Sequence, residues 1–222
     1  MIEIILDTET TGLSAEKDRV VEIACVELNN YIPTNNIFHT FINPEIKVST
    51  DAFRVHGYSD EFLSTKPKFK DIAQDFINFI KDKKLIIHNA DFDLGFLNNE
   101  FKRLNLKPIL KSEVIDTLQI ARSKFPGTGN SLDALCKRFK INIELREKHS
   151  ALLDCQLLSK VYIELIEKKE LTLDLKSNNE ILNQEQKFVK NGDGIIVKVS
   201  KEQMEEYKKF LKKNVSNSFA LD

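Results

Sequence analysis

The amino-acid sequence predicts a mixed α/β fold in which a β-sheet is flanked by helices. Two observations support this prediction. The N-terminal part contains short apolar segments rich in β-branched residues and Phe, and later segments alternate between helical periodicity and brief apolar runs. Strands joined by short connections favour antiparallel pairing, whereas strands separated by helices favour parallel pairing. We therefore expect antiparallel strands in the first half of the sheet and parallel strands in the second.

The predicted elements follow one another along the first three quarters of the chain. Strands are expected at 2–6, 20–28, 37–42, 85–88 and 114–116, because these segments are short and apolar. Helices are expected at 69–80, 91–104, 117–124, 131–138 and about 150–167, from the spacing of apolar residues and a capping serine at Ser131. Gly12 lies in a polar connection between the first two strands.

Composition excludes several classes of protein. The chain has 222 residues and a formal net charge of −1, so it is not strongly basic, and any nucleic-acid contact must be local or bridged by metal. Three cysteines without metal-ligand spacing indicate reduced, buried thiols in a cytoplasmic protein. No apolar run approaches the roughly 18–20 residues that span a membrane, and the first ten residues have no basic leader.

Acidic residues recur at the ends of predicted apolar segments. Asp7 and Glu9 follow the first strand, Asp93 begins a helix, and Asp154 lies near the start of the last long helix, five residues after His149. Residues i and i+2 of an extended chain point to the same side, so Asp7 and Glu9 can face one point. Several carboxylates are costly to bury together unless cations offset their repulsion.

These residue types favour a particular chemistry. All-oxygen ligands suit Mg²⁺ or Mn²⁺ better than zinc. Two such ions about 3.5–4 Å apart can hold a phosphate, activate a water and stabilise the leaving oxygen. A nearby histidine can accept the proton from that water. The sequence therefore predicts a metal-dependent reaction at a phosphate, with Asp7, Glu9, Asp93 and Asp154 as ligands and His149 as the general base.

Three motifs in this order resemble the DEDDh exonucleases. They are Asp7-Thr8-Glu9, the segment His88-Asn89-Ala90-Asp91-Phe92-Asp93, and His149 followed five residues later by Asp154. A related branch carries Tyr at a shorter spacing, which this chain does not. Segments 53–63, 130–139 and 151–162 also resemble the proofreading (epsilon) subunits of bacterial DNA polymerase III. The resemblance covers residues 1–168.

The resemblance implies a ribonuclease H-like fold and hydrolysis of DNA from its 3′ end to nucleoside 5′-monophosphates, with two Mg²⁺ or Mn²⁺ ions. It implies that Asp7 bridges both ions. Seven further residues would contact the terminal nucleotide: Thr8, Thr10, Thr11, Leu13, His56, Asn89 and Phe92. An unpaired or frayed 3′ end would supply selectivity, with little readout of base edges.

The C-terminal part changes in character after Lys169. We expect a polar linker over 169–190 and a tail over 191–222 that binds the polymerase catalytic subunit. Residues 170–175, Glu-Leu-Thr-Leu-Asp-Leu, resemble the peptide with which bacterial replication proteins bind the sliding clamp, but Glu replaces the usual Gln. A frayed helix end with alternating leucines is the alternative for 170–175, and packing on its own domain is the alternative for the tail.

Simpler interpretations accompany several residues. His88 is expected to be a structural hydrogen-bonding residue, Asp91 to lie near a helix N-terminus, and Asp116 to cap a helix. Glu22 and Asp133 are expected to be structural or solvated, and His39 to have no functional role. Two other functions compete with proofreading. One is a free-standing DEDDh nuclease that trims RNA or DNA 3′ ends, and the other is a non-catalytic protein that bridges polymerase and clamp.

Overall fold

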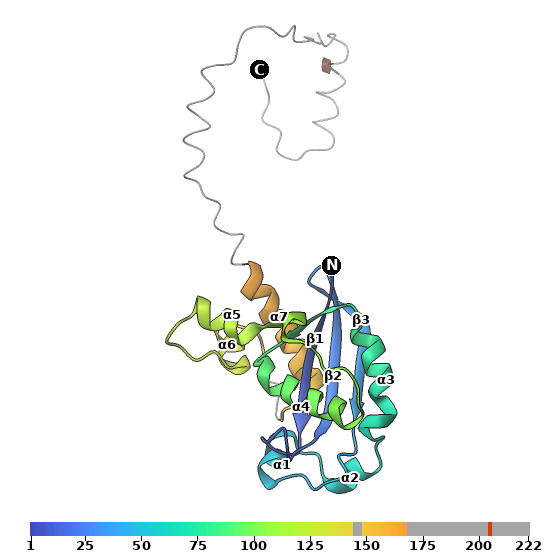
Figure 1. Ribbon diagram of the computed structural model, residues 1–222. Helices are drawn as coiled ribbons and strands as arrows, with labels where there is room; N and C mark the ends of the chain where they lie inside the picture. The colour runs from blue at the N-terminus through green and yellow to red at the C-terminus, as the bar shows by residue number, and fades with distance from the viewer. Residues whose placement is uncertain (144–147, 168–203, 206–222) are drawn as a thin grey trace. The chain divides into compact units, whose positions relative to one another are not determined.

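A computed structural model describes residues 1–143, 148–167 and 204–205 of the chain (Figure 1). The chain divides after Leu173 into two units, and the fold and the candidate site described below lie in the first. The predicted linker at 169–190, the clamp-like peptide at 170–175 and the tail at 191–222 lie outside the described residues, apart from Met204 and Glu205.

The sheet has five strands in the order β3-β2-β1-β4-β5. They are β1 (Ile2–Thr10), β2 (Val20–Asn29), β3 (Ile32–Phe41), β4 (Lys84–Ile87) and β5 (Val114–Asp116). The pairs β1–β2 and β2–β3 are antiparallel, whereas β1–β4 and β4–β5 are parallel. The predicted mixed sheet is therefore confirmed, including the change from antiparallel to parallel pairing.

Seven α-helices and one short 3-10 helix surround this sheet in the described part of the chain. They are α1 (Thr50–His56), α2 (Asp60–Ser64), α3 (Phe69–Ile80), α4 (Ala90–Arg103), η1 (Lys111–Glu113), α5 (Thr117–Lys124), α6 (Leu132–Arg138) and α7 (Ala151–Glu167). The five predicted helices are confirmed to within a residue or two, and Ser131 caps α6 by accepting a hydrogen bond from the backbone of Ala134. The short helices α1, α2 and η1 were not predicted.

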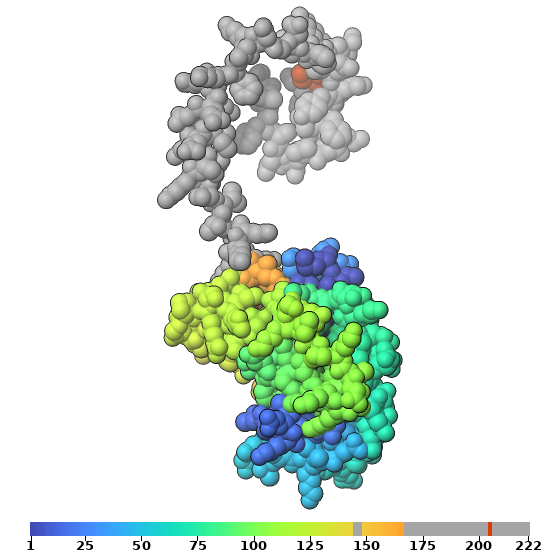
Figure 2. All heavy atoms as spheres, in the orientation of Figure 1, coloured from blue at the N-terminus to red at the C-terminus, as the bar shows by residue number. Residues whose placement is uncertain are grey.

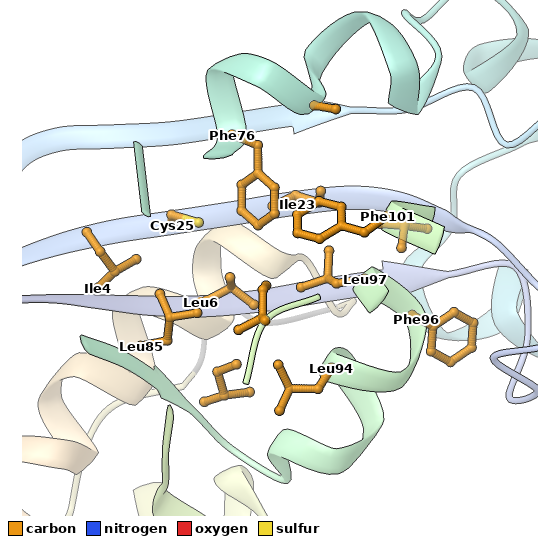
Figure 3. Packing of buried hydrophobic residues seen from close by; sticks show 14 of the residues in the cluster. Ile4, Leu6, Ile23, Cys25, Phe76, Leu85, Leu94, Phe96, Leu97 and Phe101 are labelled. Atoms are coloured by element: carbon orange, nitrogen blue, oxygen red, sulfur yellow. The ribbon is translucent and has the colours of Figure 1, made fainter. Parts of the chain in front are cut away.

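Strand side chains alternate between two cores, one on each face of the sheet. On one face, Ile4 and Leu6 of β1 pack with Phe76 of α3 and Phe101 of α4 (Figure 3). On the other face, Ile5 packs with residues of α7. A third cluster joins α5, α6 and α7. The helices α4 and α7 therefore cover opposite faces of β1, and each brings its own residues to that strand.

Two smaller expectations concern thiols and membranes. Cys25, Cys136 and Cys155 are all buried and none forms a disulfide, which agrees with the expectation of reduced thiols. No helix among the described residues combines the length and apolar character needed to cross a membrane.

Candidate active site

Asp7 and Glu9 lie within β1, which continues to Thr10 instead of ending before Asp7. The prediction of a strand ending at residue 6 was therefore wrong. The error has a physical reason, because pairing with β2 continues past the apolar run, with Asp7 opposite Ala24 and Glu9 opposite Glu22. By strand alternation, Asp7 and Glu9 share the side of Ile5, which is the side covered by α7.

Asp93 reaches β1 from the other face. It lies in the first turn of α4, directly after β4, and its side chain is only 3% exposed. The hydroxyl of Thr8 donates a buried hydrogen bond of 2.7 Å to Asp93 Oδ1. Thr8 points to the α4 side because it alternates with its neighbours along β1. β1 thus directs Asp7 and Glu9 toward α7, and Thr8 toward Asp93 of α4.

Asp154 and His149 belong to the start of α7. Asp154 is 5% exposed, and its backbone amide donates to the carbonyl of Ser150. His149 Nδ1 lies 3.3 Å from Asp154 Oδ2, and the backbone amide of His149 donates to the carbonyl of Val55 in α1. One potential ligand atom from each of Glu9, His149 and Asp154 lies within 4.8 Å of the others. The segment around 149–154 therefore meets β1 as predicted.

The acids of the site affect the pKa values of one another. Burial raises the pKa of Asp7 well above its usual value, and the nearby charges of Asp93, Asp154 and Glu9 raise it further. Burial likewise raises the pKa of Asp93 to about 7, although the hydrogen bond from Thr8 opposes this change. Since Asp93 and Asp154 act on Asp7 from opposite faces of the sheet, the four acids form one electrostatic cluster around the end of β1.

This donor set fits a hard divalent cation. The cluster offers carboxylate oxygens from four positions and lacks the thiolates that would favour a softer metal, because Cys155 nearby is a buried thiol whose pKa is raised. Burying several like charges is strongly unfavourable without a compensating positive charge. The chemistry of Asp7, Glu9, Asp93 and Asp154 therefore fits such ions.

The residues expected to contact a nucleotide differ in their exposure. Thr8, Thr10 and Thr11 are buried, whereas Leu13 is 88% exposed on the β1–β2 loop. Asn89 is the exposed N-cap of α4 in a left-handed conformation, and Phe92, in the first turn of that helix, is half-buried against Phe96. His56 ends α1, where it is buried and stacks on Tyr58 with ring centroids 4.7 Å apart.

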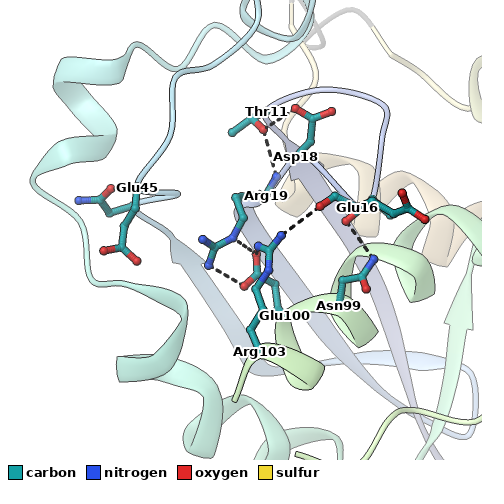
Figure 4. Close-up of polar contacts among 10 residues, drawn as sticks. Thr11, Glu16, Asp18, Arg19, Glu45, Asn99, Glu100 and Arg103 are labelled. Atoms are coloured by element: carbon teal, nitrogen blue, oxygen red, sulfur yellow. Dashed lines mark hydrogen bonds and ion pairs between the residues drawn. The ribbon is translucent and has the colours of Figure 1, made fainter. Parts of the chain in front are cut away.

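The β1–β2 loop is held by α4. Arg19 at its end makes a two-pronged ion pair with the buried carboxylate of Glu100, with Nη2 2.7 Å from Oε2 (Figure 4). Asn99 and Arg103 donate to backbone carbonyls of the loop. A side chain at Gly12 would displace the Asp18 carboxylate from its hydrogen bonds with Thr11 and Ser14, since an added Cβ would lie 2.5 Å from it. In Figure 2 this loop, in blue, lies beside the cyan segment that contains α1 and α2.

Most of the simpler interpretations hold. His88 Nδ1 lies 2.9 Å from the hydroxyl of Thr117, and Asp116 caps α5 by accepting from the backbone of Leu118. Asp91 lies in the first turn of α4, exposed and paired with Lys111. Each of these residues therefore has a structural explanation.

His39 makes a structural contact, because its Nε2 lies 2.7 Å from a buried carboxylate oxygen of Glu22. Glu22 is structural, as expected, but it is fully buried rather than solvated. Burial alone would raise the pKa of Glu22, but hydrogen bonds from His39, the backbone of Ala151 and Tyr58 outweigh it and lower that pKa. In the sequence, Glu22 is one acid within an apolar strand, and the only available signal was that such a charge needs partners.

Comparisons with known proteins agree with this geometry. The sequence model of a family described as exonuclease matches residues 4–162. Among solved structures, exonuclease X in complex with 5′-overhanging duplex DNA is 26% identical, with a TM-score of 0.61 over 77% of this chain and 95% of that one. The nuclease domain of 3′hExo, a DEDDh family member bound to rAMP, shares the fold at 17% identity, with a TM-score of 0.64 over 75% of this chain and 92% of that one.

Curated relatives extend over nearly the whole chain. The DNA polymerase III subunit epsilon of Rickettsia felis is 46% identical over 218 residues, which is 94% of this chain and 95% of the relative. The protein of the same name from Buchnera aphidicola subsp. Schizaphis graminum is 43% identical over 229 aligned positions, covering 94% and 96%. The chain therefore belongs to the exonuclease family, in the branch formed by the epsilon subunits of bacterial DNA polymerase III.

Proposed function

We propose that this chain is a 3′→5′ exonuclease that proofreads newly made DNA as a subunit of a replicative polymerase. The observation that carries the proposal is the cluster of Asp7, Glu9, Asp93 and Asp154 around the end of β1, with His149 beside Asp154. Relatives named DNA polymerase III subunit epsilon support the biological setting. In this proposal the chain acts in the cytoplasm, where bacterial DNA is replicated.

The carboxylates of Asp7, Glu9, Asp93 and Asp154 would hold two Mg²⁺ or Mn²⁺ ions. When bound, these ions supply an activated water and offset the charge that develops on the leaving oxygen. His149 has a side chain that is 46% exposed and so is accessible to a substrate, and it would take the proton of the attacking water. General-base help of this kind contributes roughly 10²–10⁴ in rate.

The terminal nucleotide would lie against the backbone from Thr8 to Thr11, at the end of β1. Leu13, exposed on its loop, and Phe92, half-buried on α4, would contact the base or sugar. His56 and Asn89 would contact the nucleotide or its phosphate. Contacts of this kind do not read base edges, so selection for a mismatched end would come from its tendency to fray.

The first experiment is hydrolysis of a 5′-labelled single-stranded oligonucleotide in Mg²⁺, with products resolved one nucleotide at a time. Shortening from the 3′ end is expected, and EDTA should abolish it. Asp7→Ala should lose detectable activity while its circular dichroism stays native, whereas Asp75→Ala, an exposed acid on α3, should remain active. Full activity of Asp7→Ala would refute the metal assignment.

A free-standing nuclease that trims RNA is the second function to test. The rAMP-bound neighbour is similar in fold only and does not favour it. The same assay with RNA of identical sequence separates the two, because a proofreading enzyme should show a higher kcat/KM for DNA. A preference for RNA would support the trimming function. Absence of hydrolysis of either substrate in Mg²⁺ and in Mn²⁺ would favour a non-catalytic bridging protein.

The partner segments are part of the proposal. Residues 191–222 would bind the polymerase catalytic subunit and 170–175 the sliding clamp. Deleting 190–222 should preserve hydrolysis of free oligonucleotides and abolish co-purification with the polymerase subunit. Replacing Leu173 and Leu175 with Ala should weaken binding to the clamp. Equal co-purification of full-length and shortened chains, or an unchanged affinity for the clamp, would contradict the respective assignment.

A further inference from the structure

Glu22 is a fully buried carboxylate near the start of β2, directly opposite Glu9 in the pairing of β1 with β2. Four donors from three separate parts of the chain surround its two oxygens. They are His39 Nε2 at 2.7 Å and Ser150 Oγ at 3.1 Å on Oε1, and Tyr58 Oη at 2.8 Å and the backbone amide of Ala151 at 3.0 Å on Oε2.

This arrangement distinguishes Glu22 from the four acids of the cluster. An ionised carboxylate offers about four lone-pair sites, and here all four face protein donors. Each oxygen therefore already accepts two protein hydrogen bonds, which leaves it poorly suited to bind a cation. Glu22 lies close enough to raise the pKa of Asp7 by its charge, yet its contacts are those of a structural anchor.

Two of the four donors belong to the beginning of α7. The Ala151 amide is one of the first amides of the helix, which have no acceptor within the helix itself. Glu22 accepts from it across a separation of 129 residues, and so caps α7 from a neighbouring strand. A negative charge at this end is also favoured by the helix dipole. Ser150, which donates to the other oxygen, accepts the backbone hydrogen bond of Asp154.

The other two donors, His39 and Tyr58, hold the carboxylate of Glu22 in place. His39 comes from β3, and Tyr58 lies between α1 and α2 and stacks on His56. The backbone of α1 also accepts from the amide of His149 through Val55. The residues on either side of Ser150 are therefore held to the sheet and to α1 by short polar contacts, and His149 and Asp154 both belong to this held segment.

We propose that Glu22 is a positioning residue of the exonuclease, which holds the start of α7 so that His149 and Asp154 lie beside Glu9. The inference rests on the proposed function and deepens it. In this proposal Glu22, which belongs to none of the sequence motifs, connects β1, which carries Asp7 and Glu9, with the segment that carries His149 and Asp154. Glu22 acts through its hydrogen bonds to the protein and does not contact substrate or metal.

The test compares two substitutions of similar size in the full-length chain. Glu22→Met removes every acceptor, whereas the amide oxygen of Glu22→Gln still accepts from Ala151 and its NH₂ group can donate to the rotatable hydroxyl of Ser150. Misplacing a reacting group by about 1 Å can reduce a rate by about 100-fold, so kcat of Glu22→Met should fall by that order. KM for the oligonucleotide should stay within about twofold, because the contacts to the nucleotide are retained.

A second readout does not depend on catalysis. Mn²⁺ binding to the metal-free proteins is measured by calorimetry, with Mn²⁺ alone as the probe. Loss of a residue that orients a metal ligand typically weakens metal binding by about 10–100-fold, and Glu22→Met should weaken Mn²⁺ binding by about tenfold. Glu22→Gln should keep kcat and Mn²⁺ affinity within about fivefold of the unmodified protein, since it keeps most of the hydrogen bonds.

Glu3→Met is the matched control. Glu3 is also a buried carboxylate that joins the sheet to α7, through a 3.0 Å hydrogen bond from Tyr162, but it lies far along the helix from Asp154. Glu3→Met should lower Tm and keep kcat and Mn²⁺ affinity when both are measured well below Tm. If Glu3→Met loses as much kcat and affinity as Glu22→Met, or if Glu22→Gln is as impaired as Glu22→Met, the positioning role is overturned.

Ser150→Ala covers the case in which Glu22→Met does not fold, because it removes a single donor from the start of α7. Its kcat should fall by about threefold to tenfold with an unchanged KM, which is the effect of one lost hydrogen bond of about 1 kcal/mol. An unchanged kcat and Mn²⁺ affinity would overturn the proposal. If the unmodified protein hydrolyses nothing, the proposed function fails, while the Mn²⁺ affinities still decide the positioning role.

Discussion

Replacing Asp93 with Asn should stabilise the metal-free protein while it abolishes activity. Asp93 is buried, and its pKa is raised from 3.8 to about 7, mainly by burial. Asn has nearly the same shape, and its amide oxygen can still accept the hydrogen bond from Thr8. The substitution thus removes a buried charge and keeps the packing.

The size of the effect follows from the pKa change. One pKa unit corresponds to about 1.4 kcal/mol, so keeping Asp93 ionised at pH 8 costs the folded metal-free protein roughly 4 kcal/mol. Allowing for an imperfect fit of the amide, we expect Asp93→Asn to raise the free energy of unfolding by about 2–4 kcal/mol. For a domain of this size that corresponds to a Tm increase of roughly 5–15 °C.

The effect should depend on pH in a defined direction. A carboxyl group with a folded pKa above its unfolded value binds more protons in the folded state, so the stability of the unmodified protein falls as pH rises from about 4 to about 7. The advantage of Asp93→Asn should therefore be absent near pH 4 and fully developed above pH 7. Thermal melts in EDTA at a series of pH values measure it directly.

Adding Mn²⁺ should make the unmodified protein more stable than Asp93→Asn. A ligand that binds only the folded state raises Tm, and the intact set of acids should gain more than the variant that lacks one of them. Asp75→Asn, on the exposed face of α3, is the control and should follow the unmodified protein throughout. A variant that is less stable than the unmodified protein in EDTA at pH 8 would refute the description of the site as a cluster of repelling acids.

Three further predictions concern the frame of the site. Phe76→Ala, which empties a fully buried position of the main core, should lower the free energy of unfolding in urea by about 3–5 kcal/mol. Glu100→Gln, which breaks the buried pair with Arg19, should lower that free energy by about 3 kcal/mol. Because the substitution frees the β1–β2 loop, it should raise KM for an oligonucleotide more than it lowers kcat. An unchanged KM would argue against that role of the loop. Ser131→Ala should cost about 1 kcal/mol through the lost cap of α6, a change that urea unfolding can resolve and that should leave kcat intact.

The elements that the sequence predicted well have strong local signals. Phe69, Phe76 and Ile80 mark one face of α3 at helical spacing, and β5 is bounded by polar residues on both sides. The helices that escaped prediction have no apolar stripe, although Ser49 and Ser59 cap α1 and α2. In α1, Phe53 and Val55 are both exposed, so its apolar residues do not form a stripe that could reveal a helix. These short helices are fixed by capping and tertiary contacts rather than by periodicity.

The sequence alone determined which acids could form the site, because Asp7 and Glu9 two apart on a strand, Asp93 at a helix start and Asp154 after His149 are local patterns. Only the tertiary structure decided that Glu22, His39 and Tyr58 support them. Their hydrogen bonds join residues up to 129 positions apart, and such bonds leave no periodic trace in the chain. Partners of this kind are set by the order and register of the strands, which place β2 beneath the start of α7.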